Sequence, residues 1–245
     1  FYKQRLSQLP EYNLIHFLIA MGHRYIREGR MHLSTYALND CLKAEDYAKL
    51  DLRQLRDAIQ KAGIDQADQS VAYFLLQSNY DDALDRLAPE HVWPFFAEQP
   101  DFLAEALGLL PSQLHGYYES YNVAAALQIL GYFPQLPTQF IPRLLELALG
   151  ESKSYRLQAQ QLLQRLPDIR LRAEEGLASS KQEIRIVAAE WLVRLNDVAA
   201  IAALQTALKK EKREVVIAAL LTALEKLGED ISAHLSPEHL LKDAE

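Results

Sequence analysis

The sequence has little cysteine, glycine and proline, and it lacks a long apolar run. The one cysteine, Cys41, excludes an internal disulfide framework or a zinc site built from cysteines, and fits a reducing compartment. With 9 Gly, 10 Pro and 49% hydrophobic residues, the 245-residue chain is neither collagen-like nor of low complexity. Apolar segments 14–21 and 215–224, which His16 and Thr222 interrupt, are too short for a membrane helix of about 18 residues. We therefore expect a globular, cytoplasmic protein with no membrane segment.

The chain also lacks an excess of positive charge. It holds 26 Lys+Arg against 33 Asp+Glu, a net charge of −7, and residues 41–120 carry 6 Lys+Arg against 14 Asp+Glu. Neutralising a phosphate backbone requires clustered cations, so we do not expect a nucleic-acid partner. The start shows no signal peptide, and because Phe1 stands where Met would begin a protein, we expect a piece of a longer polypeptide.

Alternating β-branched runs are absent, and valine and threonine are few, which predicts an all-α fold. In the first half, Asp51 and Gly63 are suited to begin and end a helix over 52–62, and Pro89 to open another over 90–98. The remaining predicted helices of this half are 11–28, which Gly29 ends, 68–78, 81–87 and 101–109. We interpret residues 1–118 as an irregular helical region, either degenerate repeats or a cap on the second half of the chain.

The second half contains a repeated pattern in segments 122–134, 155–167, 184–196 and 216–228. Their ninth residues are all leucine, at steps of 33, 29 and 32 residues: Leu130, Leu163, Leu192 and Leu224. The fifth position is alanine except at Leu220, and small residues there let two helices approach closely. A period near 30 with one apolar stripe is typical of stacked helical hairpins. Each shared segment is then a second helix, and the first helices are 138–150, 168–179 and 197–209, capped by Thr138, Asp168 and Asp197.

Residues 184–192, with the sequence IRIVAAEWL, resemble the V-R-x-x-A-A-x-A-L signature in the second helix of HEAT repeats, especially the short bacterial kind. Segment 155–163 is similar, whereas Ile217 and the pair Asn122 and Val123 depart from the signature. The resemblance covers about residues 120–230 and implies a right-handed α-α superhelix over 119–245, a solenoid whose concave face of second helices binds partners. The long helical chain is also similar in character to the large bacterial molybdate metabolism regulators.

The same resemblance implies roles for single residues. Arg156 and Arg185 should hydrogen-bond the turn of the adjacent repeat, with Asp168 and Asp197 as their natural partners. Trp191 stands where the family has alanine, and we favour a core position for it over a partner-stacking one.

Positions seven, ten and eleven of the second helices point away from the buried stripe. They supply the predicted partner-binding residues: Gln161, Gln164, Arg165, Glu190, Arg194, Glu225 and Lys226. We predict a non-enzymatic interaction or scaffold module of a larger regulatory protein, with an unknown protein partner on the concave face. The alternatives are a nucleic-acid-binding HEAT-like module and an enzyme of the HEAT-like lyase or hydroxylase kind.

Catalytic and metal-binding patterns are missing from the sequence. It has no G-x-S-x-G or G-x-G, and none of its seven histidines pairs at metal-ligand spacing, so we predict no catalytic residue, cofactor or metal. Two cationic clusters are interpreted as a helix end and a solvated turn. They are His23, Arg24, Arg27, Arg30 and His32, then Lys209, Lys210, Lys212 and Arg213.

Overall fold

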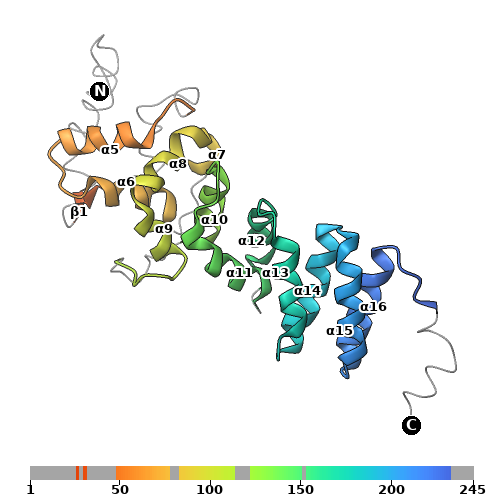
Figure 1. Cartoon of the computed structure of the whole chain (residues 1–245). Helices are drawn as coiled ribbons and strands as arrows, with labels where there is room; N and C mark the ends of the chain where they lie inside the picture. Colours follow the sequence, from red (N-terminus) through yellow and green to blue (C-terminus); the bar gives the residue numbers. More distant parts are fainter. Residues whose placement is uncertain are drawn as a thin grey trace. The chain divides into compact units, whose positions relative to one another are not determined.

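The protein is built from many short helices (Figure 1). The computed structural model describes residues 48–77, 83–113, 122–150 and 153–232, and the backbone of 26–27 and 30–31. Twelve α-helices lie in these ranges, and most contacts join helices that follow one another in the chain. The prediction of an all-α fold is therefore confirmed.

Contacts divide the chain into two units, residues 1–140 and 141–245. The described helices of the first unit are α5 (Leu52–Lys61), α6 (Ala67–Leu76), α7 (Ala83–Arg86), α8 (Pro89–Glu98), α9 (Pro100–Ala106), α10 (Val123–Tyr132) and the short 3₁₀ helix η1 (Thr138–Phe140). Helix α8 packs against α5, α9 and α10, and Phe95 and Phe96 on α8 are fully buried. Helix α10, the first copy of the repeated pattern, thus packs within this unit. The predicted boundary between the irregular helical region and the repeats, at residues 118 and 119, stays a prediction from the sequence pattern.

Local signals in the sequence place several helix ends in the first unit. The Asp51 carboxylate accepts a hydrogen bond from the Arg53 backbone N–H and caps α5, which ends before Gly63 at φ 81°. Pro89 opens α8, and the Asn122 side chain caps α10 by accepting from the Ala125 N–H. These ends agree with the predicted ones within one or two residues.

The predicted helix over 11–28 is wrong at its end. Strands β1 (Ile26–Arg27) and β2 (Arg30–Met31) pair antiparallel there, with Arg27 opposite Arg30. Strand β2 lies against α6, and such tertiary contacts can override a local helical preference. The two arginines are therefore not a cationic helix end. The rest of that predicted helix, including His23 and Arg24, lies outside the described residues, and so does His32 of the same cationic cluster.

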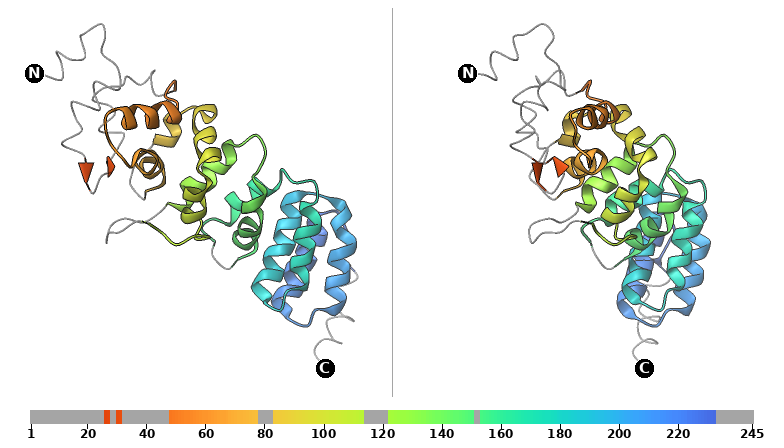
Figure 2. Two further views of the ribbon diagram at one scale, coloured as in Figure 1. Left: turned by 60° about the vertical axis from the view of Figure 1, so that its left-hand side comes forward. Right: turned by 90° about the vertical axis from the view of Figure 1, so that its left-hand side faces the viewer.

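The second unit contains three helical hairpins. Helix α11 packs on α12, α13 and the short 3₁₀ helix η2 pack on α14, and α15 packs on α16. Their bounds are α11 (Ile141–Leu149), α12 (Arg156–Leu163), α13 (Ile169–Glu175), η2 (Gly176–Ala178), α14 (Gln182–Leu195), η3 (Val198–Ala200), α15 (Ile201–Lys210) and α16 (Glu214–Lys226). Helix α14 also packs on α16, so two second helices are neighbours, and both views of Figure 2 show these cyan and blue helices side by side.

The predicted apolar stripe forms the core of this unit. Leu163 and Leu192 at the ninth position are fully buried, and Leu224 is 2% exposed. Ala159 and Ala188 at the fifth position are also fully buried. A Cβ added to Gly176 of η2 would lie 2.9 Å from the Ala188 Cβ, so small residues allow the expected close approach.

The predicted caps of the first helices give a mixed result. Asp197 accepts a hydrogen bond from the Ala199 N–H, as a cap does. The Asp168 side chain makes no capping bond and instead pairs with Arg172, one turn along the same helix. Thr138 is itself the first residue of η1.

Candidate functional site

A groove runs between the second helices α14 and α16. We call it the second-helix groove, and its volume is ≈ 540 Å³. It is lined by Glu190, Val193, Arg194, Ala218, Ala219, Thr222, Ala223 and Lys226. Charged side chains of both signs stand beside three alanines, so a partner could approach the α16 backbone closely.

Helical periodicity places all of these residues except the buried Ala223 at least partly at the surface. Leu192 on α14 and Leu220 and Leu224 on α16 point into the core, which turns the positions between them outward. Glu190 and Lys226 are exposed. The groove is therefore the outer side of the two helices whose inner sides bury the repeated pattern.

Arg194 is held in place by a buried residue. Its Nε donates to Gln160 Oε1 at 2.9 Å, and Gln160 Nε2 donates to the Ala148 carbonyl at 2.8 Å. Gln160 is only 2% exposed, so the Arg194 side chain links α14 to α12 and, through Gln160, to the α11 backbone. Burial lowers the pKa of Arg194, while the Glu190 carboxylate, 3.9 Å away, opposes that shift.

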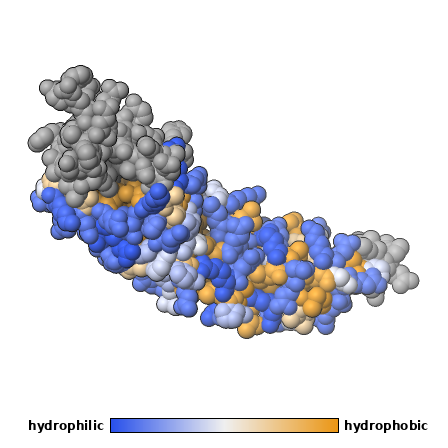
Figure 3. Space-filling model, turned by 90° about the horizontal axis from the view of Figure 1, so that it is seen from above, coloured by the Kyte–Doolittle hydropathy of each residue, from blue (hydrophilic) through white to orange (hydrophobic). Residues whose placement is uncertain are grey.

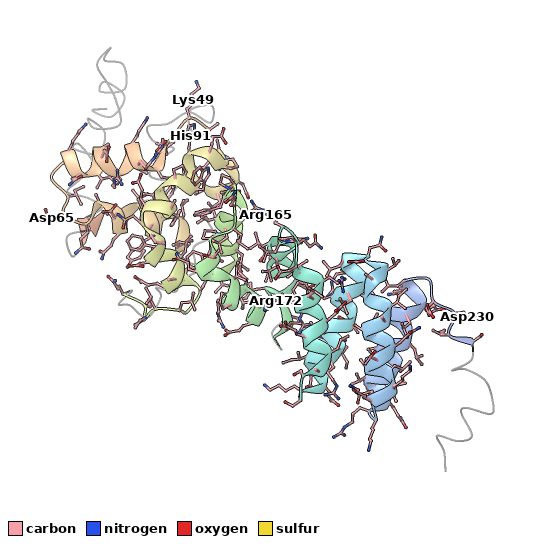
Figure 4. All side chains as sticks on the ribbon, viewed as in Figure 1. Lys49, Asp65, His91, Arg165, Arg172 and Asp230 are labelled. Atoms are coloured by element: carbon pink, nitrogen blue, oxygen red, sulfur yellow. The ribbon has the colours of Figure 1, made fainter. Side chains whose placement is uncertain are left out.

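The structure brings three of the seven predicted binding residues together. Glu190, Arg194 and Lys226 line the second-helix groove. The other four are exposed and do not line it: Gln161, Gln164, Arg165 and Glu225. In Figure 4, Arg165 lies near α12, well separated from α16. Partner binding by all seven stays a prediction.

Arg185 bridges two turns between helices. Its Nη1 donates to the carbonyls of Ser179 and Ser180, at 2.9 and 3.2 Å, in the turn before α14. Its Nε and Nη2 donate to the Glu211 carboxylate, at 2.6 and 3.2 Å, in the turn before α16. The hydrogen bonds from Arg185 outweigh burial and, with those from the Lys212 and Arg213 N–H groups, lower the pKa of Glu211 to about 2.

The expected link to the adjacent turn is therefore present at Arg185, but the expected partners are wrong. Asp197 pairs with Arg170, Nε to Oδ2 at 3.0 Å, and Asp168 pairs with Arg172. Arg156 donates to the Gly150 carbonyl at 2.7 Å. The acceptor for Arg185 is Glu211, 26 residues further along the chain, because the turns of successive hairpins lie close together.

A second groove, which the sequence did not predict, lies between η2 and α15. We call it the first-helix groove, and its volume is ≈ 830 Å³. Apolar and small residues line its inner part: Leu177, Ala178, Ala202, Ala203 and Ala207. Lys210, Lys212 and Arg213, three members of the cationic cluster interpreted as a solvated turn, line it with Arg185 and Glu211. The sequence signal for it was the run of small residues on α15.

Apolar side chains also reach the surface of the second unit. Leu157 and Leu171 are half exposed, and Val198 and Val215 are more so. Figure 3 shows hydrophobic residues interspersed among hydrophilic ones on the face that it presents. The surface is mixed, and single exposed apolar side chains of this kind are ordinary on a protein surface.

The first unit holds an ionic cluster around Asp51 at the start of α5. Asp51 pairs with Arg53 at 3.0 Å, and His91 Nδ1 is 3.6 Å from the same carboxylate. Burial raises the pKa of Asp51, but hydrogen bonds from the Arg53 side chain and backbone N–H lower it overall. Figure 4 labels His91 on α8 near this point. Because Asp51 caps α5, the cluster has a structural role.

The described residues indicate neither a metal site nor a membrane-spanning helix. Among them, no group of three or more His, Cys, Asp or Glu residues could hold a metal ion. Cys41 and every histidine except His91 lie outside these ranges. No described helix is both long and apolar enough to span a bilayer.

Comparisons with known proteins leave this chain without an identified relative. No protein family, curated protein or solved structure matches it. Its function is therefore inferred from its own geometry.

Proposed function

We propose that residues 141–245 form a HEAT-like, non-enzymatic interaction module that binds a protein partner in the second-helix groove. The observation that carries this proposal is the pairing of α14 with α16 around a groove of ≈ 540 Å³. In a right-handed stack of HEAT-like hairpins, such neighbouring second helices would line the concave face. The repeated pattern, the buried leucines and the hairpin contacts support this arrangement.

The mixed charge of the groove favours a protein partner over a nucleic acid. Glu190 lies beside Arg194 in the groove and would repel a phosphate backbone. Ala218, Ala219 and Ala223 offer space for a partner's apolar side chains, while Glu190 and Lys226 can form charge pairs with it. The module would thus bind a segment that carries both charge signs and apolar residues.

The test compares two variants with the same substitutions and the same net charge. The groove variant is Glu190→Lys with Lys226→Glu, and the control is Glu214→Lys with Lys209→Glu. All four side chains are exposed, but only the first pair lines the groove. Arg194 is left unchanged because its bond to buried Gln160 would confuse binding with stability.

Each bait, with the wild-type chain beside it, is incubated with a lysate of the source cells, and bound proteins are quantified by mass spectrometry. We expect at least one protein to fall about tenfold with the groove variant, equivalent to about 1.4 kcal/mol, and to stay bound to the control. Thermal melts should show that both variants remain folded. Recovery of the same proteins by all three baits would contradict the proposal.

A further inference from the structure

We propose that the first-helix groove is a second binding site, for an acidic peptide segment that also carries large apolar side chains. None of its lining residues belongs to the second-helix groove, and α14 is shared by the two grooves but contributes only Arg185 to this one. The inference goes beyond the proposed function because it assigns a second surface and a ligand class. Its test uses separate variants, so either proposal can fail alone.

The inner part of the groove can accept apolar groups. Leu177, which is 7% exposed, lines it from η2, and α15 contributes Ala202, Ala203 and Ala207. Side chains this small leave the ≈ 830 Å³ volume between η2 and α15 unfilled. An apolar partner side chain that enters it removes apolar surface from water on both molecules.

The groove is cationic at one end. Lys210, Lys212 and Arg213 are exposed, and none of their side chains pairs with a carboxylate in the described ranges. The two acidic residues of the lining already have partners, since Glu174 pairs with Arg170 and Glu211 with Arg185. Three cations therefore remain for an acidic ligand in a chain of net charge −7.

The turn that carries these cations is fixed by hydrogen bonds. Glu211 Oε1 accepts from the backbone N–H groups of Lys212 and Arg213, at 2.9 and 3.0 Å. The Arg185 guanidinium binds the same carboxylate and also the turn between η2 and α14. The cationic end is thus preorganised next to the apolar part, which reduces the ordering cost of binding.

The composition of the groove favours an acidic peptide over a nucleic acid. Nucleic-acid sites use many phosphate contacts and usually aromatic stacking, whereas this lining offers three available cations and no aromatic side chain. A peptide with carboxylates beside leucine or phenylalanine matches both parts. The expected ligand is therefore an acidic amphipathic segment of a partner protein.

The probe is a fluorescein-labelled synthetic peptide of alternating Glu-Leu and Asp-Phe pairs, read by fluorescence anisotropy. The charge variant is Lys210→Glu with Lys212→Glu and Arg213→Glu. The control is Lys209→Glu, the same change one residue before the groove lining. A second variant, Ala203→Trp, fills the apolar part without changing charge.

We expect the charge variant and Ala203→Trp each to weaken binding at least about tenfold, and Lys209→Glu to bind like the wild-type chain. Raising the salt from about 0.05 M to about 0.3 M should weaken peptide binding, as for screened charges. Replacing the peptide's acids by Gln and Asn should abolish it. Binding that salt does not change, with equal binding of the neutral peptide, overturns the proposal.

Two further outcomes also overturn it. One is an absence of peptide binding at protein concentrations up to about 1 mM. The other is tighter binding of a duplex oligonucleotide than of the peptide, lost in the same charge variant, which would assign the groove to nucleic acid. Pull-down results from the Glu190 and Lys226 variants do not bear on these outcomes.

Discussion

Trp191 is completely buried, yet no described residue accepts a hydrogen bond from its indole N–H. This agrees with a core position rather than a partner-stacking one. A buried polar group without a partner costs about 1–3 kcal/mol. The tryptophan therefore contributes a large apolar side chain and a polar atom that opposes its burial.

Trp191→Phe should consequently be tolerated. The smaller ring leaves a cavity, but removing the unpaired N–H offsets that loss, so we expect a change within about 1 kcal/mol in the free energy of unfolding. Urea denaturation measures it, with Leu192→Ala, expected to cost about 2–5 kcal/mol, as the reference for a simple loss of packing. Equal losses for the two variants would show that the indole nitrogen is satisfied.

The lowered pKa of Glu211 predicts that the free energy of unfolding depends on pH. Its folded-state pKa of about 2 lies below the ordinary value of 4.5, so its ionised form stabilises the folded state above about pH 4.5. That contribution is lost as the pH falls from 4.5 towards about 2. Glu211→Gln should thus be less stable than the wild-type chain near pH 7, and the gap should narrow in acid.

Thermal melts of the two proteins across this range measure the gap. Glu225→Gln, a change of an exposed side chain that lines neither groove, is the control. It should show little difference from the wild-type chain at any pH. A constant gap for Glu211→Gln from pH 7 to about pH 3 would mean that the carboxylate charge is not what Arg185 stabilises.

At the scale of elements, η2 lies close to α14 in the second unit. Gly176 has φ −62°, an ordinary helical value, so alanine is excluded there by packing and not by backbone strain. An added Cβ would lie 2.9 Å from the Ala188 Cβ and 3.2 Å from a Leu149 methyl group. The contact therefore requires glycine on one side and alanine on the other.

We expect Gly176→Ala to destabilise the protein by about 1–3 kcal/mol, the usual range for overpacking a core. The same substitution at the exposed Gly131 in α10 should be neutral or stabilise by up to about 1 kcal/mol, because alanine favours helices. Chemical denaturation of both variants measures these changes in the free energy of unfolding. Stabilisation by Gly176→Ala would show that η2 can move away from α14.

The sequence predicted the helices well because each has its own local signals. The apolar stripe through Leu163 and Leu192, the Asp51 cap and the Pro89 start act within single segments. The β1–β2 pair was missed because its support comes from α6, far along the chain. Local patterns therefore identify elements but not the contacts that modify them.

The candidate site was less predictable for the same reason. The repeat assigns Arg165, Arg194 and Lys226 to one position, but which second helices are neighbours depends on packing, and only the latter two line one groove. Likewise, Glu211 became the partner of Arg185 through the proximity of two turns. The first-helix groove is left open by the small side chains of α15, and because alanine carries no functional group, its positions in the sequence do not indicate a site.

Across the whole molecule, each unit has its own core and one of the two tryptophans. Trp93 in the first unit lies 5.8 Å from Phe133, centroid to centroid, and Trp191 is buried in the second. The variant Trp93→Phe therefore keeps Trp191 as a single fluorescent reporter, in the second unit. The variant Trp191→Phe keeps Trp93, in the first unit. This allows the stability of each unit to be followed separately.

We expect the two units to unfold as separate transitions because most contacts stay within one unit. Leu192→Ala should then lower the stability reported by Trp191 by about 2–5 kcal/mol and leave the urea midpoint reported by Trp93 unchanged. Leu103→Ala, a fully buried leucine of α9, is the reciprocal variant and should shift only the Trp93 signal. If either variant moves both midpoints together, the chain unfolds as one cooperative structure, and binding variants in the second unit would need stability controls in the first.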